Sequence, residues 1–114
     1  MLFGEALREL RRKHGVTQRE LADKTGLDFS YISKVENGRN PPPAADTIVK
    51  ICAALEEPPE QLLALTAKLP SDIHQTVSGS PAAQVFLREA QRLNLTEEDW
   101  RLLSDHVRQL RDDD

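Results

Sequence analysis

Apolar residues recur along this chain at spacings of three and four, which is the pattern of amphipathic helices. No run alternates apolar and polar residues between turn signals, so the sequence predicts an all-helical protein. Periodicity, capping residues and helix-stopping residues together predict the helix positions. The predicted helices cover 2–14, 17–26, 28–37 and 45–55, then a segment from about 59, then 71–77, 80–93 and a last segment from 96.

Two short helices in the first third of the chain are joined by a tight turn that contains a glycine. Thr17 and Glu20 have the spacing of a capping box, which starts the first of these helices. Gly26 closes that helix, and Asp28 is a good N-cap for the second. Two helices joined by a turn of about three or four residues form the helix-turn-helix pattern.

The outer face of the second helix suits the major groove of DNA, which is about 12 Å wide and admits one helix. Small serines permit close approach, a lysine can donate to guanine O6 or N7, and a phenylalanine can contact a thymine methyl group. We therefore expect bases to be read by Phe29, Ser30, Ser33 and Lys34. We expect the phosphate backbone to be held by Thr17, Gln18, Tyr31, Asn37 and Arg39.

The stretch GVTQRELADKTGLDFSYISKVENGRNPP resembles the helix-turn-helix of the Cro/C1-type repressors, also called the XRE family. The likeness covers about residues 3–66 and implies a five-helix, lambda-repressor-like domain that binds double-stranded DNA. In that family the pair matching Arg11 and Glu36 forms a partly buried ion pair, so the resemblance implies a structural ion pair here. Family members often carry Gln, Arg or Asn at the positions matching Phe29, Ser30 and Lys34. Readout of DNA shape, or through water, is therefore expected to contribute more in this chain.

Composition shifts after residue 69, which predicts a helix-turn-helix domain over 1–69 and a small helical dimerisation region over 70–114. Trp100, Leu103, Val107 and Leu110 follow one another at spacings of three, four and three, an a/d-type seam. This strip could cover the predicted 80–93 helix or pair with a partner subunit. We favour a homodimer, because a few short helices have little core of their own. The resembled family also usually binds near-palindromic operators as a two-fold dimer.

The stretch LTAKLPSDIHQTVSGSPAAQVFLREAQRLNLTEEDWRLL is similar to the tails of small XRE regulators found beside ImmA/IrrE-type metallopeptidases. That resemblance implies a repressor of its own operon whose tail is cleaved by a partner peptidase, so that the dimer fails and the operon is released. Two alternatives stay open. One is an antitoxin whose tail binds a toxin, and the other is a protein-interaction adaptor that uses the same helices.

The charge distribution, the single cysteine and the lack of a long apolar segment narrow the possible partners and the cellular location. The net charge of the 114 residues is −4, yet residues 1–40 hold eight Lys/Arg against six Asp/Glu. A basic head is compatible with DNA, although an ordinary mixed surface is the alternative interpretation. The lone Cys52 excludes an intramolecular disulfide and fits a reducing compartment. With neither a signal peptide nor an apolar span, we expect a cytoplasmic protein away from membranes.

An enzyme is not expected. His14, His74 and His106 lie in three separate segments and lack the paired spacing of a metal-binding helix such as HExxH. No glycine-rich phosphate loop follows a strand, and no nucleophile elbow is present. The sequence therefore predicts no catalytic residue, no metal site and no cofactor.

Overall fold

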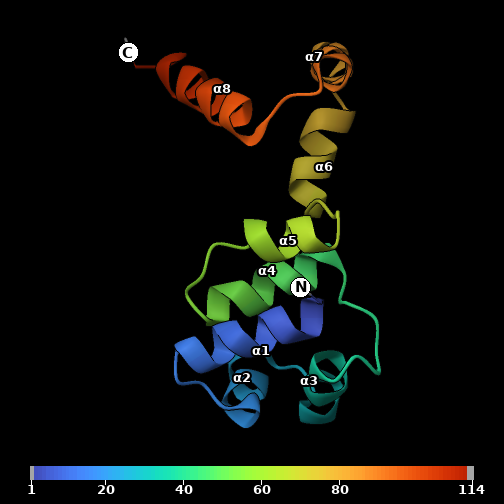
Figure 1. Ribbon diagram of the computed structural model, residues 1–114, viewed down its shortest axis with the longest axis vertical. Helices are drawn as coiled ribbons and strands as arrows, with labels where there is room; N and C mark the ends of the chain where they lie inside the picture. Colours follow the sequence, from blue (N-terminus) through green and yellow to red (C-terminus); the bar gives the residue numbers. More distant parts are fainter. Residues whose placement is uncertain (1, 113–114) are drawn as a thin grey trace. The chain divides into compact units, whose positions relative to one another are not determined.

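The computed structural model describes residues 2–112, and every regular element in that range is a helix (Figure 1), which confirms the all-helical prediction. The helices are α1 (Phe3–Lys13), α2 (Gln18–Thr25), α3 (Phe29–Glu36), α4 (Ala45–Ala54), α5 (Glu60–Leu65), α6 (Ser71–Ser78), α7 (Pro81–Leu93) and α8 (Glu97–Gln109).

The chain forms two compact units that divide between residues 74 and 75, within α6. We call the described parts the head (2–74) and the tail (75–112). The predicted boundary after residue 69 would place all of α6 in the tail. The first turn of α6 instead packs with the head, because Asp46 of α4 accepts hydrogen bonds from Ser71. The Ser71 backbone N lies 2.9 Å from Asp46 Oδ1, and its Oγ lies 2.7 Å from Oδ2.

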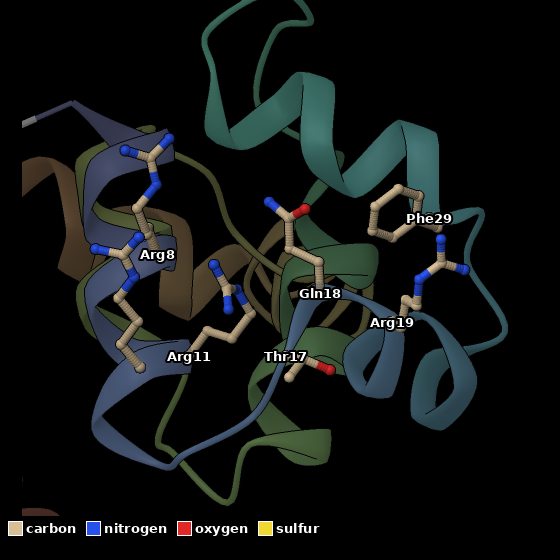
Figure 2. A pocket seen from close by; sticks show the side chains of 7 residues that line it. Arg8, Arg11, Thr17, Gln18, Arg19 and Phe29 are labelled. Atoms are coloured by element: carbon tan, nitrogen blue, oxygen red, sulfur yellow. The ribbon is translucent and has the colours of Figure 1, made fainter.

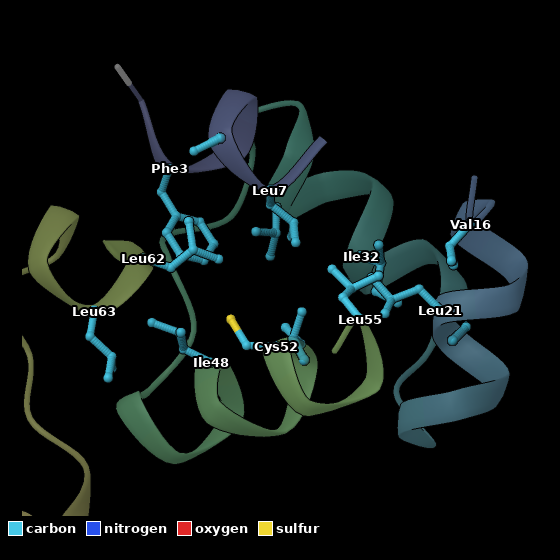
Figure 3. Packing of buried hydrophobic residues seen from close by; sticks show 14 residues of the cluster. Phe3, Leu7, Val16, Leu21, Ile32, Ile48, Cys52, Leu55, Leu62 and Leu63 are labelled. Carbon is cyan, nitrogen blue, oxygen red and sulfur yellow. The ribbon is translucent and has the colours of Figure 1, made fainter. Parts of the chain in front are cut away.

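The head is built around an aliphatic core to which all of its first five helices contribute (Figure 3). Residues without exposed surface come from three of those helices and include Leu7, Leu21, Ile48 and Cys52. Burying each of the large aliphatic side chains stabilises the fold by about 1.5–3 kcal/mol. Burial, and then the nearby charges of Glu57 and Glu60, raise the pKa of the Cys52 thiol to about 11, so it remains protonated in the core.

Local capping chemistry sets the helix starts as the sequence predicts. The Thr17 side chain accepts from the Glu20 backbone N, and the Glu20 carboxylate accepts from the Thr17 backbone N, which completes the capping box. Asp28 caps α3 by accepting from the backbone N of Ser30 at 2.8 Å. Gly26 ends α2 with φ +75°, in the left-handed region that favours glycine. These caps fix the turn between α2 and α3.

Helix α5 buries two of its three leucines. Leu62 and Leu63 are buried, whereas Leu65 is 46% exposed. The helix has six residues, so it makes fewer than two turns. Two adjacent leucines already occupy the face toward the core, and Leu65 at the end of the helix points away from it.

The tail has little core of its own. Among its described residues, Ala90 of α7 is the buried apolar side chain, at 6% exposure. An apolar groove lies between α7 and α8 and is lined in part by Phe86, Leu102 and Leu103. Of the seam predicted on α8, Leu103 is half-buried, while Trp100, Val107 and Leu110 are exposed. The single chain therefore leaves most of this strip uncovered.

Candidate nucleic-acid interface

Helix α3 is held by its inner face and is free on its outer face. Ile32 and Val35 are buried in the core at 1% and 3% exposure. Ser30 and Lys34 are exposed on the opposite side, and Ser33 is half-buried between these two sides. The predicted base-reading residues of α3 thus include two accessible polar side chains on a rigidly anchored helix.

A buried carboxylate at the end of α3 fixes that helix to α1. The Glu36 side chain has no exposed surface. Arg11 holds it with two parallel bonds, its Nε donating to Oε2 at 2.8 Å and its Nη2 donating to Oε1 at 2.9 Å. Arg11 also donates from Nη1 to the Val16 carbonyl oxygen at 2.9 Å. The structure therefore brings together the ion pair that the family resemblance implies, and the pair joins α1 to α3.

The charge state of Glu36 follows from this surrounding. Burial by itself disfavours the ionised carboxylate and acts to raise its pKa. Hydrogen bonds from Arg11 and Gln18, with the positive charges of Arg11 and Arg8, outweigh that effect, so the pKa of Glu36 lies below its ordinary value. The hydrogen bond to Glu36 in turn raises the pKa of Arg11. Both groups are therefore charged at neutral pH.

Two further residues of this network were missed at the sequence level. Gln18, at the start of α2, donates from Nε2 to Glu36 Oε1 at 3.0 Å, so part of its amide is used within the protein. Arg8 donates to the Glu36 carbonyl oxygen at 3.3 Å and to Asn37 Oδ1 at 3.0 Å. The signal for Arg8 was present, because it lies three positions before Arg11 and thus on the same face of α1.

The start of α2 opens into a shallow hollow of about 540 Å³ that is rich in arginine (Figure 2). Its lining comes from α1, α2 and α3 and consists of Arg8, Arg11, Arg12, Thr17, Gln18, Arg19 and Phe29. The Thr17 side chain caps the backbone N–H of Glu20, while those of Gln18 and Arg19 have no acceptor within the helix. Together with the positive end of the helix dipole, they make this a favourable place for an anion such as phosphate.

Phe29 contacts Arg19, a residue that the sequence did not predict to be part of the DNA-binding surface. The Arg19 guanidinium carbon lies 4.7 Å from the centroid of the Phe29 ring, a cation–π contact between α2 and α3. Phe29 is 37% exposed, and Arg19 is exposed as well. Figure 2 shows the two side chains next to each other at the edge of the hollow.

The remaining predicted backbone contacts occupy different surroundings. Thr17 is exposed at the hollow, with its hydroxyl oxygen already accepting the capping bond. Tyr31 is partly buried and packs against the core. Asn37 accepts from Arg8, so it also has a structural role. Arg39 is exposed after α3, beside a groove that includes Phe3.

The described residues contain no group of three or more His, Cys, Asp or Glu placed to bind a metal ion. Within the same range, no helix is long and apolar enough to cross a membrane.

A family model described as helix-turn-helix matches residues 7–62. RghRB of Bacillus subtilis (strain 168), named as an uncharacterized HTH-type transcriptional regulator, is 39% identical over 80 residues, 68% of this chain and 58% of that protein. RghR of the same organism, named as an HTH-type transcriptional repressor, is 41% identical over 61 residues, 54% of this chain and 45% of that protein. The chain thus spans about half the length of these relatives.

Solved structures agree with the helical arrangement. The restriction-modification controller protein C.AhdI from Aeromonas hydrophila is 42% identical, with a TM-score of 0.50 over 53% of this chain and 86% of that chain. A chain of the SinR protein/SinI protein complex has a TM-score of 0.52 over 95% of both chains, at 23% identity, a likeness of fold alone. Both curated relatives are thus named as transcriptional regulators of the helix-turn-helix type.

Proposed function

This chain belongs to the helix-turn-helix family of the Cro/C1 (XRE) type, and from that premise we propose that it is a sequence-specific DNA-binding repressor that acts as a homodimer. The proposal rests on one observation above others. The exposed face of α3 and the arginine-rich hollow at the start of α2 lie next to each other on the head. A groove-reading helix beside a phosphate site is the arrangement that a helix-turn-helix protein needs.

Binding to the duplex upstream of its own gene tests the proposal and its autoregulatory part. We expect tight binding to that duplex over a scrambled one in fluorescence anisotropy, with affinity falling steeply as salt increases. Lys34→Ala should weaken operator binding about tenfold, within the usual cost of losing one base contact. Lys50→Ala removes the same charge from the exposed side of α4 and serves as the matched control. Equal binding of the wild type to both duplexes would contradict specific autoregulation.

Dimerisation is proposed for the tail because its apolar strip lacks cover within the chain. Trp100, Val107 and Leu110 are 39%, 61% and 66% exposed, and such strips commonly mark interaction surfaces. A two-fold dimer would place two heads on two half-sites of a palindromic operator.

Val107→Asp tests this interface, because an unpaired charge in an apolar contact is strongly disfavoured. We expect this variant to be monomeric in sedimentation equilibrium at concentrations where the wild type is dimeric, and to bind the operator more weakly. Gln109→Asp introduces the same charge at an exposed polar position of α8 and should leave the dimer intact. A wild type that is monomeric at tens of micromolar would contradict a dimeric repressor.

Control of the dimer by a partner stays a prediction that rests on the tail resemblance. Cleavage by an ImmA/IrrE-type peptidase, or capture of a toxin, would act on the same uncovered strip. Incubation with a cognate ImmA/IrrE-type peptidase should shorten the chain within its tail and release the operator. An uncut chain would remove the peptidase from the proposal.

A further inference from the structure

We propose that Arg19, held against Phe29, reads a guanine in each half-site, so that one base contact comes from α2 instead of the recognition helix α3. We call these two residues the Arg19–Phe29 pair. The inference rests on the proposed DNA-binding function and specifies which side chain reads one base.

Position is the first argument. Phe29 is the first residue of α3. In helix-turn-helix proteins, the N-terminal residues of the recognition helix are those that meet base edges. A phenylalanine at this position has no hydrogen-bonding group, so by itself it offers an apolar contact. The guanidinium carbon 4.7 Å from its ring centre brings hydrogen-bond donors to that same place.

The chemistry of the guanidinium is the second argument. A cation–π contact uses its positive charge, and the side chain still has five N–H donors for acceptors outside the protein. Among the described residues, Arg19 makes no ion pair and no side-chain hydrogen bond, whereas Arg8 and Arg11 are both engaged with Glu36. Arginine bonded to guanine O6 and N7 is the commonest specific contact in the major groove.

The ring gives the arginine a defined place. A long exposed side chain loses rotamer freedom when it binds, and this loss opposes binding. Contact with the Phe29 face restricts Arg19 before DNA arrives, which reduces that loss. Figure 2 shows both side chains at the rim of the hollow, with Gln18 between them and the arginines of α1. Different residues would thus bind a phosphate in the hollow and a guanine at its rim.

The test is selection from a randomised duplex library with the full chain, followed by sequencing of the bound fraction. Wild type should select a palindromic consensus with a guanine in each half-site. Arg19→Ala should reduce the preference for that guanine at least about fivefold and leave the other positions unchanged. Phe29→Leu keeps apolar bulk but removes the ring face, and it should weaken the same preference. Arg19→Lys keeps the charge and should not restore the preference, because the bidentate fork is lost.

Arg12→Ala is the matched control, since Arg12 is an exposed arginine of the same hollow on α1. It should weaken binding to all sequences alike and leave the consensus unchanged. The inference is overturned if Arg19→Ala behaves in this same uniform way, because Arg19 would then contact phosphate. It is equally overturned if Arg19→Ala selects the wild-type consensus at full strength. A wild type that selects no consensus overturns the proposed function itself, and this inference with it.

Discussion

Replacing Glu36 with alanine is expected to destabilise the head by about 3–5 kcal/mol, the usual effect of removing one partner from a buried ion pair. The carboxylate has no exposed surface and accepts hydrogen bonds from Arg11 and Gln18. Its loss leaves the Arg11 guanidinium, which is itself buried, without a compensating charge. Urea unfolding followed by circular dichroism measures the change. A decrease below about 1 kcal/mol would show that water readily replaces the carboxylate.

Two further variants show whether the loss of stability is specific to the buried ion pair. Glu9→Ala removes an exposed carboxylate from α1 and should change stability by less than about 0.5 kcal/mol. Arg11→Met combined with Glu36→Leu replaces the pair with apolar groups of similar size, and it should recover most of the stability lost in Glu36→Ala. The recovered protein should nevertheless bind DNA less well, because Gln18 would lose the partner that orients its amide.

The same carboxylate makes the stability of the head depend on pH. The pKa of Glu36 is lower in the folded chain than its ordinary value of 4.5, so ionised Glu36 stabilises the fold above about pH 4.5. That stabilisation is lost as pH falls through the folded-state pKa. Glu36→Gln cannot titrate, so its stability should change less than that of the wild type over this acid range.

Local chemistry explains which parts of the fold the sequence could predict. The capping boxes at Thr17 and Thr96 join groups three residues apart, so the helix starts at α2 and α8 were readable without a structure. Asp28 and Gly26 fixed the turn before α3 in the same way. The burial of Ile32 and Val35 agrees with their spacing of three positions along α3.

Two of the missed contacts join residues that periodicity cannot bring together. Gln18 and Glu36 are eighteen positions apart, and their hydrogen bond depends on the start of α2 meeting the end of α3. Arg19 and Phe29 lie on different helices, on either side of the turn, and no spacing rule relates their side chains. The sequence left two arrangements open for the α8 strip, because the cover it receives depends on how α7 packs against it.

Close packing at the end of α3 gives the second large effect, at Gly4 of α1. A Cβ placed on Gly4 would lie 2.6 Å from the carbonyl oxygens of both Val35 and Glu36. Alanine normally stabilises a helix over glycine by roughly 0.5–1 kcal/mol. Here the overlap is with backbone, which cannot rotate away, and it should cost about 3 kcal/mol, the upper end for an overpacked site. The cost of the overlap exceeds the helix preference for alanine, so we expect Gly4→Ala to destabilise the head by about 2–3 kcal/mol.

The overlap is also expected to weaken DNA binding, because the two carbonyl groups belong to the last turn of α3, the proposed recognition helix. To accept the methyl group, α1 must move away from α3, and the Arg11–Glu36 contact between these helices would lengthen. Gly4→Ala should therefore lower both the urea midpoint and the operator affinity, whereas Glu5→Ala, at the next and exposed position, should lower neither. Unchanged operator affinity in a destabilised Gly4→Ala chain would show that α3 keeps its place without the close approach of α1.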